Sequence, residues 1–306
     1  VFGLMAVRDG WSAEGAKDPA TILLGRLKWN LGSDNFAGIL YSGRYTEEDK
    51  NNALALDLSY KLNNHHFSTK AILSGSKSGN ETLSDTALTA SWGCYTKKLS
   101  TFLVFEHVGD DFRMDSSYLL RNGMRRVMGY VAPSFYPKRT TWLKRLNFML
   151  WGYQVHDYRT LADDYLYFIA MRAYFPKQAN LRMDWRRFSE QWAGRQLKGD
   201  YFYLGGQVQL TNSLFFYLSF DAGDRILYDS ESPLVGKGFS GQGMVMIQPS
   251  GRLALELSVL YEKMDHPISR ERLYDVNILR FKSTYQLNRY LFCRGIVQYN
   301  ISQKKE

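Results

Sequence analysis

Histidine and acidic side chains gather in one polar stretch of the chain. His107, Asp110, Asp111 and Asp115 lie close together after an apolar segment. A carboxylate beside a histidine can activate water for hydrolysis, and carboxylate oxygens also bind divalent cations. The same composition suits an ordinary loop, because Asp side chains form local turn hydrogen bonds. We therefore predict a rim loop that contacts a cation or a partner, with hydrolysis as a minor alternative, and we expect no catalytic site.

Other motifs with a possible chemistry are weaker. The segment Gly236-Lys-Gly-Phe-Ser-Gly241 matches GxGxxG, but a dinucleotide site needs a strand before the motif and a helix after it. A strand pattern follows the motif here, so we expect no nucleotide site. His156-Asp157 with Asp163-Asp164 forms a second rim cluster that has less support. Two cysteines are too few for a disulfide scaffold or a zinc module, and we expect neither a metal nor a cofactor.

Apolar and polar residues alternate with a period of two along most of the chain. In residues 53–62, Leu54, Leu56 and Leu58 alternate with Asp57 and Ser59. This period predicts β-strands that have one apolar and one polar face. The run at 276–282 keeps its phase only if it contains a β-bulge.

The alternation predicts about seventeen strands and no helix. The strands are expected near residues 1–8, 20–31, 35–45, 53–62, 66–76, 84–95, 99–107, 125–136, 144–155, 164–175, 179–189, 200–210, 214–223, 239–248, 252–263, 272–286 and 290–300.

Short and long connectors alternate between these strands. Most short ones have about three residues, and the segment 137–143 is the exception. Sorting of loop length by end is typical of transmembrane barrels, which have tight turns on one side and longer loops on the other. The longer, polar connectors are expected near residues 9–19, 46–52, 77–83, 108–124, 156–163, 190–199, 224–238 and 264–271.

Strand length points to a membrane. The uncharged stretch Tyr201–Phe220 is long enough for a transmembrane helix, but Gly205-Gly206 and Gln207 in its middle favour a β-hairpin, because polar groups at the bilayer centre are costly. Strands of ten to twelve residues match tilted strands that cross a bilayer. A sheet in lipid must close on itself, because lipid offers no hydrogen-bond partner. We therefore predict one domain, residues 1–306, with an all-β fold: a transmembrane, antiparallel, up-and-down β-barrel.

The composition agrees with a sheet that has two different faces. The 306 residues are 45% hydrophobic and 15% aromatic, which excludes a disordered chain, and aromatic rings favour membrane interfaces. The mean hydropathy of −0.35 is explained if the polar face lines an interior. The net charge of +9 suits an anionic neighbour. The charge alone does not choose among nucleic acid, a lipid surface and another polyanion. For a barrel we expect outer-membrane lipid and lipopolysaccharide as partners, and no nucleic acid.

Fourteen charged residues on the predicted polar faces are candidates to line the interior and contact a solute. Nine of them are basic, so a water-filled interior would weakly favour anions. Pairing of acids with bases across strands would instead fill a plugged interior, and both readings stay open. The candidates are Arg26, Lys28, Asp57, Lys61, Lys70, Arg182, Asp184, Arg186, Glu256, Glu262, Asp275, Arg280, Lys282 and Arg294.

Several segments carry a resemblance to a known family. The chain resembles a group of bacterial outer-membrane β-barrels that commonly carry a family-nine-like carbohydrate-binding domain before the barrel. The Val-Gly-Asp-Asp-Phe-Arg motif at 108–113 and the Val-Gln-Tyr-Asn strand at 297–300 are the most specific matches. The matching segments are Phe2–Asp9, Glu106–Asp115, Arg121–Arg126, Ser134–Pro137 and Tyr290–Asn300.

The resemblance implies a bacterial outer-membrane protein and a choice of functions. The first is a pore or solute-binding barrel, used in uptake of small polar or anionic solutes or glycans. The alternative is a scaffold or assembly barrel that holds a lipoprotein or a secreted partner, and a hydrolase at the rim is a minor third. The sequence departs from the family because no carbohydrate-binding domain precedes Val1 and the family's closing strands do not follow. The odd strand count agrees with missing strands, so we expect this barrel portion to be incomplete.

Overall fold

The computed structural model describes residues 1–306 except 10–18, 33, 118, 120, 139–141 and 305–306. Most of the predicted loop at 9–19 and part of the predicted connector at 137–143 thus lie outside the described residues. The chain divides into two compact units. Unit 1 comprises Val1–Val131 with Tyr153–Asp163, and unit 2 comprises Ala132–Gly152 with Asp164–Glu306.

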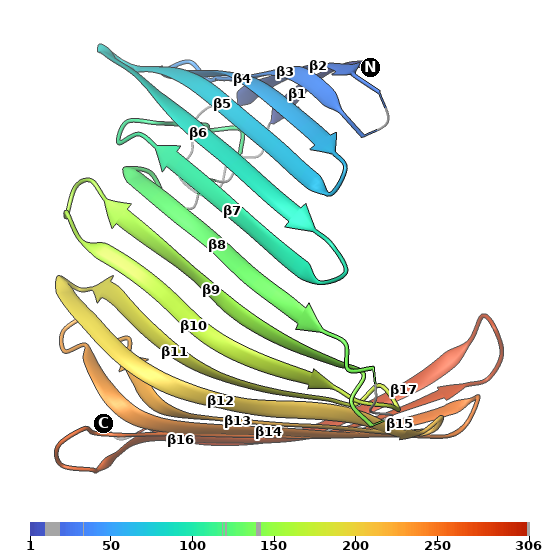
Figure 1. Cartoon of the computed structure of the whole chain (residues 1–306). Coiled ribbons are helices and arrows are strands. Elements are labelled where there is room, and N and C mark those ends of the chain that lie inside the picture. The colour runs from blue at the N-terminus through green and yellow to red at the C-terminus, as the bar shows by residue number, and fades with distance from the viewer. Residues whose placement is uncertain (10–18, 33, 118, 120, 139–141, 305–306) are drawn as a thin grey trace. The chain divides into compact units, whose positions relative to one another are not determined.

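Regular structure in the described residues consists of seventeen β-strands (Figure 1). No helix of the described residues is long and apolar enough to cross a membrane. The strands are β1 (Phe2–Asp9), β2 (Ala20–Asn30), β3 (Phe36–Tyr45), β4 (Asp49–Leu62), β5 (His65–Ser78), β6 (Glu81–Tyr95), β7 (Leu99–Val108), β8 (Met124–Phe135), β9 (Arg145–Asp157), β10 (Asp163–Tyr174), β11 (Asn180–Trp192), β12 (Arg195–Thr211), β13 (Leu214–Leu227), β14 (Leu234–Ser250), β15 (Leu253–Asp265), β16 (Arg272–Gln286) and β17 (Phe292–Lys304).

The strands pair in the order in which they follow one another along the chain. In unit 1, β1 to β7 form successive antiparallel pairs. In unit 2, β10 to β17 do the same. The predictions of an all-β, antiparallel, up-and-down fold with seventeen strands are therefore confirmed.

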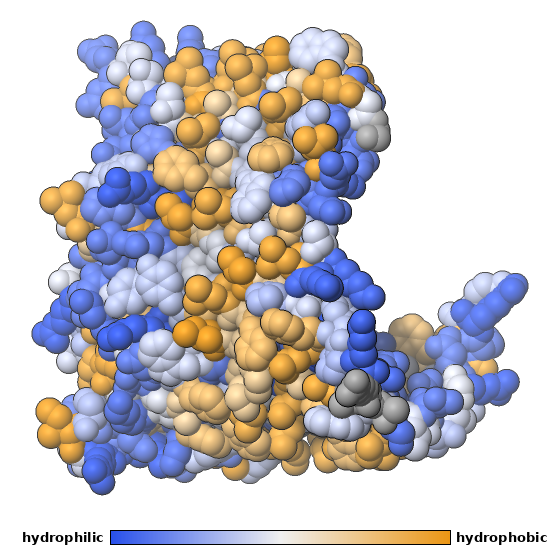
Figure 2. Space-filling view, in the orientation of Figure 1, coloured by the Kyte–Doolittle hydropathy of each residue, from blue (hydrophilic) through white to orange (hydrophobic). Residues whose placement is uncertain are grey.

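Burial in unit 1 is the reverse of that in a water-soluble sheet. On β4, the small residues Ala53 and Ala55 are 3% and 2% exposed, whereas Leu54, Leu56 and Leu58 on the opposite face are 47%, 54% and 41% exposed. Strand geometry places alternate residues on opposite faces, so the apolar face is the open one. In Figure 2, hydrophobic side chains gather over the middle of the strands, with hydrophilic ones toward the strand ends.

Several strands are longer than the alternation predicts. β4 begins at Asp49 rather than at 53, and β12 begins at Arg195 rather than at 200. The predicted long loops 46–52 and 190–199 are therefore turns of residues 46–48 and 193–194. Ala193 and Gly194 both have positive φ, at 45° and 75°, as a tight two-residue hairpin turn requires. The prediction was wrong here because polar residues occupy the ends of these strands as readily as they occupy loops.

The backbone of Gly223 on β13 generates a testable prediction. Its φ is +143°, and a Cβ there would lie 2.4 Å from the Asp200 carbonyl oxygen. We expect Gly223→Ala to lower the free energy of unfolding by about 1–3 kcal/mol. Gly243→Ala on β14 is the control, because its nearest neighbour, Leu218 Cδ1, lies at an ordinary 3.6 Å. Denaturant titration measures both variants, and equal stabilities would contradict the prediction.

Candidate functional site

An ion pair reaches across one strand on the polar face of unit 1. Arg26 of β2 donates hydrogen bonds to both carboxylate oxygens of Asp57 of β4, at 2.6 and 2.7 Å. Between them runs β3, where a Cβ on Gly38 would meet each of these side chains at 2.7 Å. The absence of a side chain at Gly38 therefore leaves the space in which the two charges meet.

Two lysines flank this pair and leave the row basic. Lys28 is opposite Gly38 in the β2–β3 register, and Lys70 is opposite Asp57 in the β4–β5 register. The Lys28 ammonium lies 4.0 Å from the centre of the Phe36 ring. The predicted residue Lys61 lies toward the end of β4, where it pairs with Asp34 at 3.3 Å and is exposed. The structure thus brings Arg26, Lys28, Asp57 and Lys70 into one row and places Lys61 outside it.

A buried carboxylate lies between two guanidinium groups in unit 2. The Asp184 side chain on β11 is fully buried and accepts hydrogen bonds from Arg182 Nε at 2.6 Å and from Arg186 Nε at 2.5 Å. A single charge would be costly to bury alone, and the two neighbours on the same strand face compensate it. Because two cations share one anion, the group keeps a net positive charge.

Aromatic rings surround these guanidinium groups. The rings of Phe168 on β10, with Tyr201 and Tyr203 on β12, lie with centres 5.2–5.5 Å from the guanidinium carbons, close enough for cation–π attraction. The register brings them together, because Tyr203 is opposite Asp184 and Tyr201 is opposite Arg186. We call these six residues the Arg–aromatic cluster: Phe168, Arg182, Asp184, Arg186, Tyr201 and Tyr203.

A third group of charges lies on β13 to β16 in unit 2. Lys282 and Glu256 pair at 2.5 Å. Glu262 accepts a hydrogen bond from the Tyr274 hydroxyl at 2.8 Å and lies 3.9 Å from Arg225. Sequence reasoning missed Arg225 and Tyr274 as partners of Glu262. The sequence placed Arg225 in the predicted loop 224–238, whereas β13 extends to Leu227. Which side chains face one another also depends on the cross-strand register.

The predicted lining residues Asp275 and Arg294 lie apart from this group. Among the described residues, Arg280 shares a face of β16 with Lys282 but has no other link to the group. Asp275 shares a face of β16 with Leu279, because the β15–β16 register runs without a shift through 276–282. The bulge predicted in that run is thus wrong, and with it the placement of Asp275 on the face of Arg280. The exposed Arg294 on β17 donates to Thr284 at 3.3 Å.

The four predicted rim residues have separate partners in unit 1. His107 Nδ1 lies 2.8 Å from the Tyr158 hydroxyl. The Asp110 carboxylate lies 3.4 Å from Arg159, and the Asp115 carboxylate accepts from Arg113 at 2.9 and 3.3 Å. The hydrogen bonds and ion pairs of these side chains therefore indicate a structured loop.

The remaining rim residue, Asp111, makes its contact through its backbone. Its N–H donates to Asp85 Oδ2 at 2.9 Å. Throughout the described ranges, no three His, Cys, Asp or Glu side chains are grouped so that they could hold a metal ion. The expectation of a cation at His107, Asp110, Asp111 and Asp115 therefore finds no ligand group there, and contact with a partner stays a prediction.

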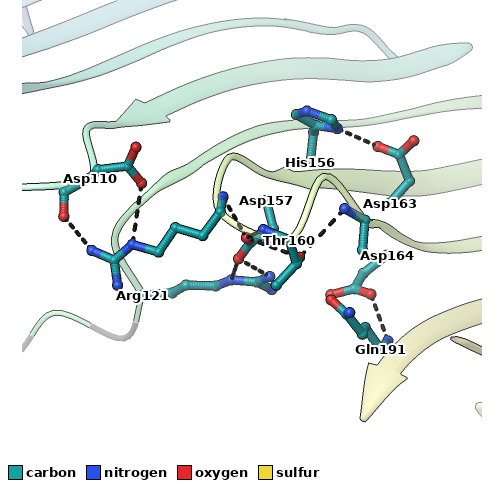
Figure 3. A network of polar contacts seen from close by, with 10 residues as sticks. Asp110, Arg121, His156, Asp157, Thr160, Asp163, Asp164 and Gln191 are labelled. Atoms are coloured by element: carbon teal, nitrogen blue, oxygen red, sulfur yellow. Dashed lines mark hydrogen bonds and ion pairs between the residues drawn. The ribbon is translucent and has the colours of Figure 1, made fainter. Parts of the chain in front are cut away.

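Asp157 organises the neighbouring connector at the end of β9 (Figure 3). Its Oδ2 accepts from Arg121 at 2.6 and 3.2 Å, and its Oδ1 accepts from the backbone N–H groups of Arg159 and Thr160 at 2.9 and 2.7 Å. Desolvation works to raise the pKa of Asp157, but the hydrogen bonds from Arg121 and Thr160 outweigh it and hold the pKa at about 2. Sequence reasoning gave this cluster little weight, because Arg121 is distant in the chain.

The low pKa of Asp157 predicts a pH-dependent stability. The value in the unfolded chain is near 3.8, so the carboxylate contributes its full stability above about pH 4 and loses it as the pH falls toward 2. We expect Asp157→Asn to cost about 1–3 kcal/mol at neutral pH and progressively less across that window. Denaturant titrations at several pH values measure this, with Asp111→Asn as control, because Asp111 contacts Asp85 through its backbone N–H. A cost that is constant from pH 4 to 2 would contradict it.

In each unit, one face of the sheet is polar and basic with some aromatic rings, and in unit 1 ion pairs hold the rim. No protein-family model matches the chain, and no curated protein matches it. The function must therefore be inferred from the two faces of the sheet and from the charges on them.

Proposed function

We propose that this chain forms a transmembrane β-barrel in the outer membrane of a bacterium, as a pore or solute-binding barrel for small polar or anionic solutes or glycans. The observation that carries the proposal is the reversed burial: Leu54, Leu56 and Leu58 are open while Ala53 and Ala55 are covered. An exposed leucine row of this kind gains its transfer free energy only when lipid or a partner covers it.

The backbone supports the same proposal. Strands of ten to seventeen residues such as β3, β12 and β14 are long enough to cross a bilayer at a tilt. Lipid tolerates a sheet only if its edge strands are paired, so closure of the sheet into a barrel is part of the proposal. The proposal also includes membership of the outer-membrane family that the sequence resembles.

The charges on the polar faces favour anions as the solute class. Lys28 and Lys70 flank a single Arg26–Asp57 pair, and Asp184 is shared by two guanidinium groups. Basic side chains along an aqueous interior raise the local concentration of anions. The rings in the Arg–aromatic cluster add flat apolar surface that a sugar or another organic solute could contact.

A scaffold barrel is the second candidate, and one observation favours it. A segment of the β7–β8 connector lies against the polar face of unit 1, where the Arg113 carbonyl accepts from Asn51 at 3.0 Å. An interior narrowed in this way suits a barrel that holds a partner such as a lipoprotein. Conductance with no bound partner would favour the pore, and silence with a co-purifying partner would favour the scaffold.

Arginine substitution on β4 tests the membrane proposal. Leu56 in the middle of the strand and Leu62 at its end share a face and are 54% and 52% exposed. In a bilayer, Leu56→Arg should cost about 2–4 kcal/mol and the matched control Leu62→Arg only about 0–1 kcal/mol, because the cost falls toward the interface. Unfolding from lipid vesicles measures both. Equal effects, or folding without any amphiphile, would contradict the proposal.

Charge reversal at the basic row tests the solute class. We expect Lys28→Glu combined with Lys70→Glu to shift the ion selectivity of reconstituted channels toward cations, because the row then becomes net acidic. Lys97→Glu combined with Lys98→Glu, in the connector between β6 and β7, is the control, because it changes the total charge by the same amount. Reversal potentials in a salt gradient give the selectivity. An unchanged potential in a conducting double variant would place the row outside the conduction path.

A further inference from the structure

Part of the β7–β8 connector lies on the polar face of unit 1. Residues 109–117, which we call the inner strap, follow β7 and contact β3, β4 and β5. Ser116 of the strap contacts Ser42 of β3 through their hydroxyl groups, and the Arg113 carbonyl accepts from the Ser74 hydroxyl of β5. Backbone and side-chain atoms of the strap therefore bind to three adjacent strands.

Asn51 of β4 is the centre of this contact. Its side-chain nitrogen donates to the Arg113 carbonyl at 3.0 Å, and its side-chain oxygen accepts from the Asp115 N–H at 3.0 Å. Asn51 is 2% exposed, so an unfilled hydrogen-bonding group there would be costly. One amide thus holds two strap residues in the way that a neighbouring strand would.

The wall beneath the strap is made of small side chains. Ser42, Ala53, Ser74 and Ser76 are all buried, and the registers place them on the face of Asn51. Large residues at these positions would hold the strap away from the sheet. Within the strap, Phe112 is buried as well. Small residues below and a buried anchor in the strap indicate a docked segment and not a loop that extends away from the sheet.

We propose that the inner strap is a constriction that sets the size limit for solutes passing the polar face of unit 1. This inference rests on the proposed pore function, because only then is that face the wall of a passage. The strap occupies space beside the wall, and it brings the Arg113–Asp115 ion pair to the passage. Asn51 is the positioning residue that keeps it in place.

A disulfide test examines docking without relying on transport. In a background of Cys94→Ser and Cys293→Ser, the pair Ser42→Cys with Ser116→Cys is oxidised with diamide in the folded protein. We expect a bridge, detected by mass spectrometry of proteolytic fragments, because the two hydroxyl groups are in contact. The pair Ser59→Cys with Ser116→Cys is the control, because Ser59 lies far along β4 from the strap contact. No bridge in the first pair would overturn the inference.

Substitution of Asn51 tests the constriction itself. We expect Asn51→Ala to lower the ratio of docked to undocked strap about tenfold, the factor that corresponds to about 1.4 kcal/mol of lost hydrogen bonding. Bridge formation should slow, and larger neutral sugars should enter proteoliposomes faster than with the wild type. Asn52→Ala is the matched control. Asn52 is the next residue along β4, lies on the face opposite the strap, and accepts hydrogen bonds from the Tyr41 and Tyr45 hydroxyl groups.

The outcomes separate this inference from the pore itself. A conducting protein in which Asn51→Ala changes bridge formation but not the size limit would overturn the constriction and leave the pore intact. A wild type that forms the bridge but never conducts would overturn the pore and the constriction together.

Discussion

The cross-strand ladder of backbone hydrogen bonds is the constraint on which the other features depend. Within each unit, most neighbouring strands pair in antiparallel register over ten or more residues, with few shifts. Such a ladder satisfies nearly every backbone donor and acceptor and forces successive side chains to opposite faces. Each unit can therefore present an apolar face and a polar face without a conventional core between them.

The polar face is stable because its charges are matched locally. Arg26 reaches Asp57 across β3 only because Gly38 has no side chain, and Asp184 is buried only because two guanidinium groups neutralise it. Half-buried pairs of this kind contribute little net stability by themselves, but they allow charged residues to occupy a face that has restricted access to water. The unequal count of acids and bases then leaves the positive character on which the proposed anion preference depends.

Packing against the polar face differs from packing in a soluble sheet. Side chains as small as Ser42 and Ala53 are covered, and the covering segment carries its own polar backbone. Asn51 supplies the hydrogen bonds that this backbone would otherwise lack. A connector can thus lie on the sheet without unpaired polar groups, and the same contacts explain why Arg113 and Asp115 belong to a structured segment.

The sequence alone determined the class and the order of the strands, because a side-chain period of two is a local property that no other regular structure produces. It also identified most of the charged residues of the polar face, since Arg182, Asp184 and Arg186 alternate visibly along one segment. It could not predict which of them meet. Contacts such as Asp57 with Arg26, or Tyr201 with Arg186, depend on cross-strand register, and a shift of one residue would separate them. The docking of the inner strap on Asn51 was likewise decided by tertiary structure, because it joins residues far apart in the chain through backbone atoms that carry no sequence signal.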